Sequence, residues 1–332
     1  MSKPSPKTNK REIFFTKEVK EEIALFLEES NETAAALLSA FIKMNGNLVL
    51  RNQQWLLHIK TENIKAAKLI VRLLKEYFDC ETQIRISEKK RLRVNANNKI
   101  IHIEINKEVK PLLQSLQIYD DMMGLQRVPT KELIKASEAQ RAYLAGAFLA
   151  SGSVNSPLTS EYHLEISSSD KEYANYLSRL MRKFYLQSKV IKRRNQFVVY
   201  VKRSDQIADF LKIVSAYKSL MKYEDIRIQR DQYNSMNRVY NCDIANEMKA
   251  QASGSRQKKL LDYIESRMGL DQLDEPLVMA AKLRYQNPEA SLNELASLYT
   301  QATGQSISKS GMNHKLRKVM EFAQKIGGDL RD

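Results

Sequence analysis

The sequence contains Leu38-Ser-Ala-Phe-Ile-Lys-Met-Asn-Gly46 and, 106 residues later, Leu144-Ala-Gly-Ala-Phe-Leu-Ala-Ser-Gly152. Both stretches are runs of small and apolar residues that predict a short helix, and a β-branched or aliphatic run follows each final glycine. Gly46 and Gly152 fit the left-handed conformation in which many helices end. Two copies of one motif predict that the first two thirds of the chain form a duplicated domain.

The segments that follow the two motifs also repeat. In the first copy we expect a strand at residues 55–60, a helix at 63–77, strands at 84–86 and 101–105, and a helix at about 107–116. In the second copy the corresponding segments are 162–167, 170–185, 190–191, 197–201 and about 205–214. The order helix, two strands, helix, two strands, helix therefore occurs twice, with an extra basic stretch at 89–93 in the first copy.

Small residues are frequent in both motif helices. They are Ala34, Ala35, Ala36 and Ala40 in the first, and Ala142, Ala145, Gly146, Ala147 and Ala150 in the second. Small side chains allow two helix backbones to approach closely, so we expect the helices to pack against each other. Alanine is also a good helix former, which would explain either helix alone. The glycine at the same place in both copies favours the packed pair.

The chain of 332 residues is strongly basic. It has 54 Lys and Arg against 39 Asp and Glu, which gives a net charge of +15 and a pI near 9.5. This excess favours a polyanionic partner, because Lys and Arg displace the counterions condensed on phosphates.

The sequence predicts neither a metal nor a disulfide nor a membrane segment. Cys80 and Cys242 have no paired spacing. The histidines are scattered without the spacing of metal ligands, at His58, His102, His163 and His314. The N-terminus lacks the apolar core of a signal peptide, and no apolar run approaches membrane-spanning length. We expect a cytoplasmic protein without a cofactor, a membrane contact or a small-molecule substrate.

The repeated motif resembles that of the LAGLIDADG homing endonucleases. Leu144-Ala-Gly146 matches its start, and Ala150-Ser-Gly152 stands at its Ala-Asp-Gly end. The resemblance implies an α+β fold in which two such helices pack together and two saddle-shaped sheets straddle DNA. In active members the carboxylate before the final glycine binds a divalent metal that activates water. Here Asn45 and Ser151 hold that place, and both are neutral, weak ligands, so phosphodiester cleavage is not expected.

Basic residues cluster in the second hairpin of each half. Residues 182–203 include eight Lys and Arg and no acidic residue, and the first copy has a similar excess around residues 85–99. A solvated charged face is the ordinary explanation for either run. Their matching places in the repeat favour a surface for phosphates or for a protein partner. Its candidate residues are Lys89, Lys90, Arg91, Arg93, Lys192, Arg193, Arg194 and Lys202.

The last third of the chain is predicted to be helical. A charged connector contains the clearest break of the chain at residues 252–255, and helices are expected at 257–268 and 277–285. Ser291 and Glu294 form a capping box at the start of a further helix. Gly304 marks the turn after it, and Ser308 begins a long final helix.

The final helix has an apolar face and a basic face. Met312, Leu316, Val319, Met320 and Ala323 lie at helical spacing and are expected to be buried. The candidate DNA-binding residues are Ser291, Ser308, Lys309, Ser310, Gly311, Asn313, His314, Lys315, Arg317 and Lys318. Asn can read adenine, Arg and Lys can read guanine or hold phosphate, and glycine permits close backbone approach. Helix, turn and basic helix is the arrangement of a major-groove reader; the alternative is a helical hairpin with a solvated face.

The stretch Ile307-Ser-Lys-Ser-Gly-Met-Asn-His-Lys-Leu-Arg-Lys318, following a degenerate LAGLIDADG domain, closely resembles the WhiA proteins of Gram-positive bacteria. This resemblance covers nearly the whole chain. It implies a non-enzymatic, nucleoid-associated protein that binds double-stranded DNA. It also implies a link to sporulation control in filamentous actinobacteria, and to cell division and chromosome segregation in rod- and coccus-shaped relatives. The abundant Lys, Asn and Gln favour the division role.

We divide the chain accordingly. The expected parts are a flexible basic N-terminus at 1–15, LAGLIDADG-like repeats at 16–120 and 121–216, a helical connector at 217–256, a helix-turn-helix domain at 257–326 and a tail at 327–332. The helix-turn-helix domain is similar to the promoter-reading region of sigma factors, and the LAGLIDADG-like domain is a candidate site for a protein partner.

Two other classes of function compete with a DNA-binding regulator of transcription or chromosome organisation. An active endonuclease or RNA maturase would need carboxylates where Asn45 and Ser151 stand. An RNA-binding protein would present stacking aromatic side chains on its sheet face, and Tyr200 is a lone candidate for that role.

Overall fold

The computed structural model describes residues 6–26, 30–51, 54–88, 99–159 and 161–327, with the backbone alone at 6–13 and 26. The chain divides into two compact units, residues 1–229 and 230–332. No helix in the described ranges combines the length and the apolar character that a membrane span requires.

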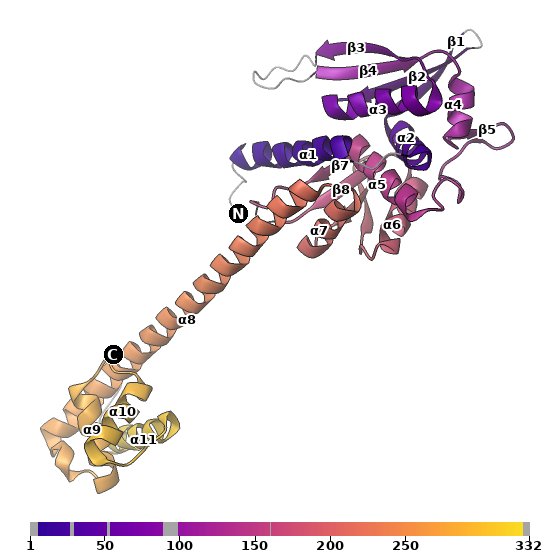
Figure 1. Cartoon of the computed structure of the whole chain (residues 1–332). Coiled ribbons are helices and arrows are strands. Elements are labelled where there is room, and N and C mark those ends of the chain that lie inside the picture. Colours follow the sequence, from indigo (N-terminus) through magenta and orange to yellow (C-terminus); the bar gives the residue numbers. More distant parts are fainter. Residues whose placement is uncertain (1–5, 27–29, 52–53, 89–98, 160, 328–332) are drawn as a thin grey trace. The chain divides into compact units, whose positions relative to one another are not determined.

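The first unit contains the predicted repeat (Figure 1). Its first half consists of α2 (Asn31–Asn45), β1 (Gly46–Arg51), β2 (Gln54–Thr61), α3 (Ile64–Phe78), β3 (Gln83–Glu88), β4 (Lys99–Ile105) and α4 (Val109–Ser115). Its second half consists of α5 (Ser137–Ser151), β7 (Gly152–Val154), β8 (Leu164–Ser168), α6 (Lys171–Lys183), β9 (Lys189–Arg193), β10 (Gln196–Val201) and α7 (Ser204–Ile213). A small hairpin, β5 (Tyr119–Asp120) and β6 (Gly124–Leu125), lies between the halves in sequence. The predicted αββαββα order is confirmed in both copies.

The two halves share strand order and register. The antiparallel sheets have the orders β1-β2-β4-β3 and β7-β8-β10-β9. Gly46 pairs with Ile59, which in turn pairs with Ile103; Gly152 pairs with Ile166, which pairs with Val199. The duplication therefore extends to individual rungs of the sheets, and residues of one half can be compared with their counterparts in the other.

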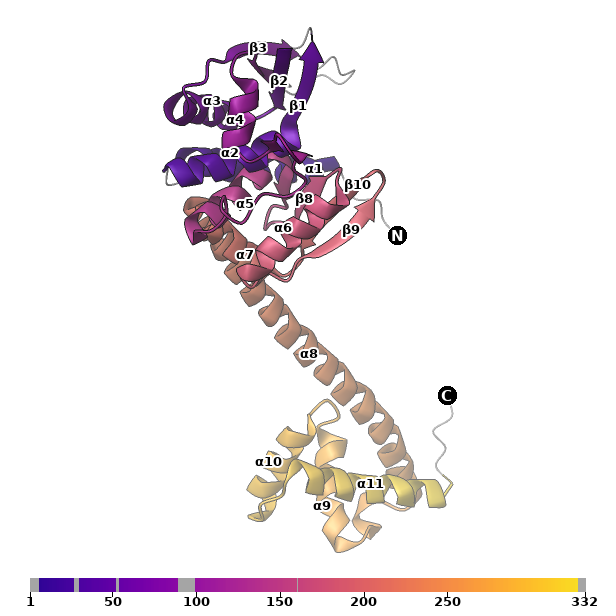
Figure 2. The same ribbon diagram turned by 90° about the vertical axis from the view of Figure 1, so that its right-hand side faces the viewer.

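Helices α2 and α5 pack side by side between the two sheets (Figure 2). They are in close contact at Gly146, where a Cβ atom would lie 2.3 Å from the carbonyl oxygen of Leu37. Ala36, Ala40 and Ala147 are fully buried. The expected packing of the two small-residue helices is thus confirmed, and it depends on one position without a side chain.

The expectation that Gly46 and Gly152 adopt a left-handed conformation was wrong. Their φ angles are −81° and −72°, in extended backbone that leads directly from helix into strand. Both glycines are explained instead by the lack of room for a Cβ atom. A Cβ on Gly46 would lie 2.4 Å from the carbonyl oxygen of Ile42, and one on Gly152 would lie 2.2 Å from the Phe148 ring.

Helical structure begins closer to the N-terminus than the sequence analysis predicted. Residues 1–15 were expected to be flexible, whereas α1 (Pro6–Phe26) includes most of them. Phe15, Val19 and Ile23 follow each other at intervals of four residues and are buried, so one face of α1 belongs to the core of the first unit. The buried Glu22 carboxylate accepts hydrogen bonds from the backbone and hydroxyl of Ser219.

The second unit is helical throughout its described elements. It contains most of α8 (Tyr217–Arg267), a short 3₁₀ helix at Leu270–Gln272, α9 (Glu275–Gln286), α10 (Leu292–Thr303) and α11 (Lys309–Lys325). The break expected at residues 252–255 was wrong, because α8 continues through them. Gly254 is needed for space: a Cβ there would lie 1.8 Å from the carbonyl oxygen of Pro288, in the loop that joins α9 to α10.

Replacing Gly146 with alanine should destabilise the first unit. The added methyl group must push two helix backbones apart, so we expect the free energy of unfolding to fall by about 3 kcal/mol. Urea unfolding followed by the fluorescence of Trp55, the single tryptophan, measures this change. Gly124→Ala is the control: nothing lies within 4 Å of its added carbon, and only the left-handed backbone opposes it, at about 1 kcal/mol. Equal losses in the two variants would contradict the close-contact explanation.

Candidate nucleic-acid interface

The last residues of α2 and α5 are bonded to the protein scaffold. The Asn45 side-chain amide donates a hydrogen bond to the carbonyl oxygen of Ala150 at 3.4 Å. The Ser151 hydroxyl donates to the carbonyl oxygen of Ser167 at 2.6 Å. Among the residues that the structure describes, no group of three or more His, Cys, Asp or Glu is placed to hold a metal ion. These two positions therefore offer a divalent cation two neutral side chains, each with a backbone partner.

The basic hairpin of the second half is only partly available to a phosphate. Lys192 and Arg193 of β9 and Lys202 after β10 are exposed, and Arg194 lies in the turn with a φ of 57°. Arg193, however, forms an ion pair with Glu165 at 3.2 Å. The predicted residues Lys89, Lys90, Arg91 and Arg93 of the other hairpin lie outside the described residues.

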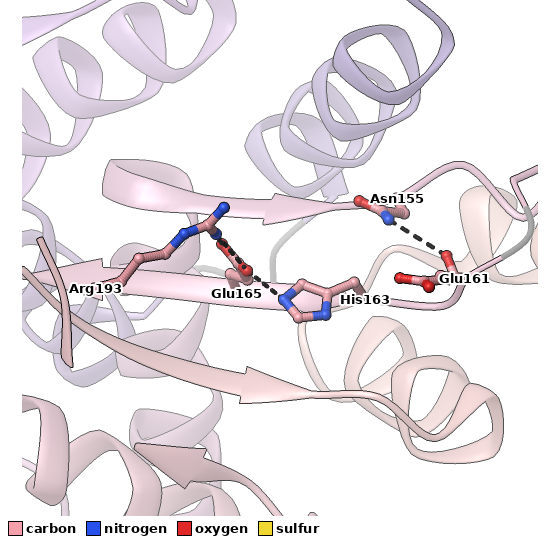
Figure 3. Close-up of polar contacts among 5 residues, drawn as sticks. All are labelled: Asn155, Glu161, His163, Glu165 and Arg193. Atoms are coloured by element: carbon pink, nitrogen blue, oxygen red, sulfur yellow. Dashed lines mark hydrogen bonds and ion pairs between the residues drawn. The ribbon is translucent and has the colours of Figure 1, made fainter. Parts of the chain in front are cut away.

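Glu165 is the centre of a polar cluster on the second sheet (Figure 3). Its carboxylate contacts Arg193 on one side and the His163 ring nitrogen Nε2 on the other. Nearby, the Asn155 side chain donates to the Glu161 carbonyl oxygen at 3.3 Å. Sequence reasoning missed this cluster because Glu165 and Arg193 are 28 residues apart. One signal was available in the sequence. Leu164, Glu165 and Ile166 alternate between apolar and polar, which predicts a strand with the Glu165 carboxylate on the face away from the core.

The first sheet has a comparable polar face. Arg85 forms an ion pair with Glu104 at 3.3 Å. Beside it the rings of His58 and His102 stack at 5.1 Å, and the Ser87 hydroxyl lies 2.7 Å from His102 Nε2. Burial, and after it the charges of nearby basic groups, lower the pKa of His58. The outer faces of both sheets therefore contain carboxylates that compensate part of their positive charge.

In the second unit, side chains cap the two helices of the predicted helix-turn-helix. The Ser291 hydroxyl accepts from the backbone N–H of Glu294 at 3.3 Å, and the Glu294 carboxylate accepts from the backbone N–H of Ser291 at 2.7 Å. Hydrogen bonds from Ser291 to the Glu294 carboxylate lower the pKa of Glu294. Gly304 ends α10 with a φ of 72°, and the Ser308 hydroxyl accepts from the N–H of Gly311 at 3.1 Å. The predicted capping box, turn and start of the last helix are confirmed.

Helix α11 has the two faces that its sequence predicts. Met312, Leu316, Val319 and Ala323 are buried, and Met320 is half-buried. The exposed candidate residues are Ser308, Lys309, Ser310, Asn313, His314, Arg317 and Lys318. Arg317 lies 3.3 Å from His314 Nδ1 and 3.5 Å from the carboxylate of Glu321, so it is held along the helix surface. Gly311 and Ser291 are half-buried.

Lys315 differs from the other basic residues of α11. Its ammonium group donates to the carbonyl oxygen of Pro276 at 2.8 Å and lies 5.4 Å from the centre of the Tyr299 ring. It therefore links α11 to the first turn of α9 and to α10. The structure gives Lys315 a role in joining the three helices, besides any role at a phosphate.

Arg284 of α9 is a buried residue that sequence reasoning missed. Its guanidinium Nη1 donates to the carbonyl oxygens of Asn287, Pro288 and Ala290, at 3.3, 3.2 and 2.6 Å. The side chain is 2% exposed, and burial lowers its pKa. These carbonyls belong to the loop that follows the end of α9 at Asn287-Pro288, outside its helical hydrogen bonds. Arg284 thus fixes the loop that leads to the capped start of α10.

Models of known protein families match most of the chain. The models for the WhiA N-terminal LAGLIDADG-like domain, the WhiA LAGLIDADG-like domain and the WhiA C-terminal HTH domain match residues 31–119, 140–233 and 236–323. A protein from Bacillus licheniformis named "probable cell division protein WhiA" is 39% identical over 312 residues, 94% of this chain and 96% of that protein. A protein of the same name from Lactobacillus acidophilus is 41% identical over 314 residues, 94% and 98% of the two chains.

A solved structure has the same fold. The crystal structure of full-length DUF199/WhiA from Thermatoga maritima aligns with a TM-score of 0.56 and 24% sequence identity, over 93% of this chain and 97% of that chain. The predicted fold class, LAGLIDADG-like repeats followed by a helical helix-turn-helix region, is therefore confirmed.

Replacing Arg284 with methionine should destabilise the second unit. Three loop carbonyl oxygens lose the hydrogen bonds of a buried guanidinium, and we expect a loss of about 2–4 kcal/mol. Arg267→Met is the matched control, because Arg267 is an exposed arginine of the same unit. Thermal unfolding followed by circular dichroism at 222 nm compares the two variants, and Trp55 fluorescence verifies that the first unit is unchanged. A transition as stable in Arg284→Met as in Arg267→Met would exclude the proposed role of the buried guanidinium.

Proposed function

The chain belongs to the WhiA family, and from this premise we propose that it is a DNA-binding regulator of bacterial cell division that reads duplex DNA with helix α11. It acts without nuclease activity. We assign it to the nucleoid in the cytoplasm, where it affects chromosome segregation or transcription, and sporulation in relatives that sporulate.

One observation supports DNA reading most directly, namely the exposed face of α11. Asn313, Arg317 and Lys318 are exposed on a helix whose opposite face is buried in the unit. A helix of this kind can enter the major groove, where Asn pairs with adenine edges and Arg with guanine edges. The net charge of +15 favours approach to the phosphate backbone.

The absence of nuclease activity is proposed from Asn45 and Ser151. Hydrolysis of a phosphodiester by this type of site needs hard anionic ligands for a divalent metal. An amide and a hydroxyl that already donate hydrogen bonds to Ala150 and Ser167 are poor replacements. The same argument disfavours an active endonuclease and a metal-dependent RNA maturase.

An RNA-binding role is less well supported by the sheet surfaces. Tyr200 lies on the second sheet, but its ring already stacks on His163 at 5.7 Å, and Lys202 lies 5.6 Å from its centre. A stacking platform for single-stranded bases needs free aromatic faces.

Removing two cations from the exposed face of α11 should weaken DNA binding. We expect Arg317→Ala combined with Lys318→Ala to lower duplex affinity at least tenfold, and to reduce the slope of log K against log salt by about one unit for each lost phosphate contact. Lys315 is left in place because its ammonium group binds Pro276. Gel-shift titrations at several salt concentrations give both quantities.

The matched control for this variant is Arg267→Ala combined with Lys325→Ala. It removes the same charge from exposed positions near the other end of α11, where Tyr263, beside Arg267, donates to the carbonyl of Ile326. Similar losses in both double variants would indicate general charge attraction and would exclude α11 as the reading helix.

The protein should not cut DNA. Supercoiled plasmid incubated with the protein and Mg²⁺ or Mn²⁺ is expected to stay intact, and EDTA should leave duplex affinity unchanged. Nicking that disappears in Asn45→Ala or Ser151→Ala would overturn the non-enzymatic assignment, because it would make these positions part of an active site.

A further inference from the structure

A groove lies between helix α3 and strand β3 in the first half of the first unit. Six aliphatic residues line it: Ile64, Ala67, Val71, Ile84, Ile86 and Ile101. Four basic residues line it as well: Lys68, Arg72, Lys75 and Lys99. Its volume is about 490 Å³, and none of the described residues that form it is acidic. An apolar surface with a basic border is therefore open to solvent.

The groove exists because α3 leaves the edge of the sheet uncovered. Within the described residues, β3 pairs with β4 and forms the edge of the sheet. Ile84 and Ile86 lie opposite Ile103 and Ile101 of β4, which are 0% and 5% exposed. Ile84 and Ile86 themselves are 54% and 63% exposed. Two isoleucines on the helix side of the sheet are thus uncovered beside a strand edge with free backbone groups.

The second half of the unit shows that the fold does not require this surface. By register, Ile86 corresponds to Lys192, since Ile86 pairs with Ile101 and Lys192 pairs with Phe197 on the equivalent strand. By distance from the helix caps, Val71 corresponds to Ser178, which is buried and hydrogen-bonded to Ser188 at 2.9 Å. The same backbone therefore has Lys192 and the buried Ser178 in the second half where the first half has Ile86 and Val71, and it keeps an aliphatic residue, Val190, where the first half has Ile84.

We infer that this groove binds an extended, acidic segment of a partner protein, which adds a strand along β3. Aliphatic side chains of the segment would cover Ile84 and Ile86, and its flanking carboxylates would pair with Lys68 and Lys75 of α3. The backbone of the segment would satisfy the free N–H and C=O groups at the edge of β3.

Charge and backbone chemistry select this occupant. A second copy pairing through β3 would bring two basic grooves together, and like charges in direct contact oppose association. An anionic lipid could pair with the lysines but would leave the edge of β3 without hydrogen-bond partners. A segment that is both acidic and extended satisfies the apolar, the charged and the backbone groups at once. The inference does not depend on DNA reading by α11.

The probe is the capped peptide Glu-Thr-Ile-Thr-Val-Thr-Glu, labelled with a fluorophore. In a strand, its two glutamates and two aliphatic residues share one face. Binding to the full-length protein is measured by fluorescence anisotropy. Two control peptides separate the contributions: one carries Gln in place of both Glu, and one carries Ser in place of Ile and Val. We expect both controls to bind at least tenfold more weakly than the probe.

Ile86→Lys is the decisive protein variant. The second half has lysine at this rung, so the fold accepts the substitution, and we expect peptide affinity to fall at least tenfold. Leu50→Lys is the matched control, because Leu50 is an exposed aliphatic residue on β1, at the opposite edge of the same sheet. Lys68→Glu combined with Lys75→Glu should lose the probe and gain the corresponding peptide with Lys in place of Glu.

Several results would overturn the inference. These are equal affinities in Ile86→Lys and Leu50→Lys, equal binding of the probe and its controls, and failure of the charge exchange.

Self-association in sedimentation velocity that Ile86→Lys abolishes would assign the groove to a second copy instead. Loss of co-sedimentation with phosphatidylglycerol vesicles in Ile86→Lys would assign it to lipid. The gel shift of Ile86→Lys should match that of the unsubstituted chain, which keeps this test separate from the proposed DNA binding.

Discussion

The contact between Gly146 and the carbonyl of Leu37 is the constraint on which the first unit depends. A Cβ atom at Gly146 would lie 2.3 Å from that oxygen, so the two central helices can approach this closely only because position 146 has no side chain. Each helix leads without a loop into the first strand of its sheet, at Gly46 and Gly152. The distance between the helices therefore fixes where both sheets begin, and it sets Asn45 and Ser151 side by side at the ends of the helices.

The scaffold and the proposed reading surface are separate in this chain. At the helix ends, Asn45 and Ser151 donate hydrogen bonds to backbone carbonyls, and on the sheets Arg85 and Arg193 pair with carboxylates. The hydrogen bonds at the helix ends leave poor ligands for a metal ion. The ion pairs on the sheets leave fewer free positive charges for a phosphate. The exposed basic face of α11 is held in place by capped helix starts and the Arg284 loop, and on it Arg317 pairs with Glu321 while Lys309 and Lys318 are exposed.

Elements with a local or periodic sequence signal were predicted correctly. The predictions failed where one residue type can serve two different structural purposes. The repeat, the capping box at Ser291 and the turn at Gly304 were all predictable. Glycine, however, serves either a left-handed backbone or a lack of space. Gly46, Gly152 and Gly254 serve the second use, which depends on atoms that tertiary packing brings close. Lys315 was predicted as a DNA-binding residue and Arg284 was not singled out, because the carbonyls that bind them are recognisable only after folding.

Duplication also explains how the two halves came to differ in surface while keeping one backbone. The buried positions of the two sheets are aliphatic in both halves, for example Ile103 and Val199. Each sheet must bury the same face against its helix. Residues outside that constraint are free to change independently. The second half has Lys192 and the buried Ser178 at the positions where the first half has the exposed Ile86 and the partly buried Val71. Exposed isoleucines beside the free edge of a strand favour aggregation, and the proposed binding partner gives a physical reason to retain Ile84 and Ile86.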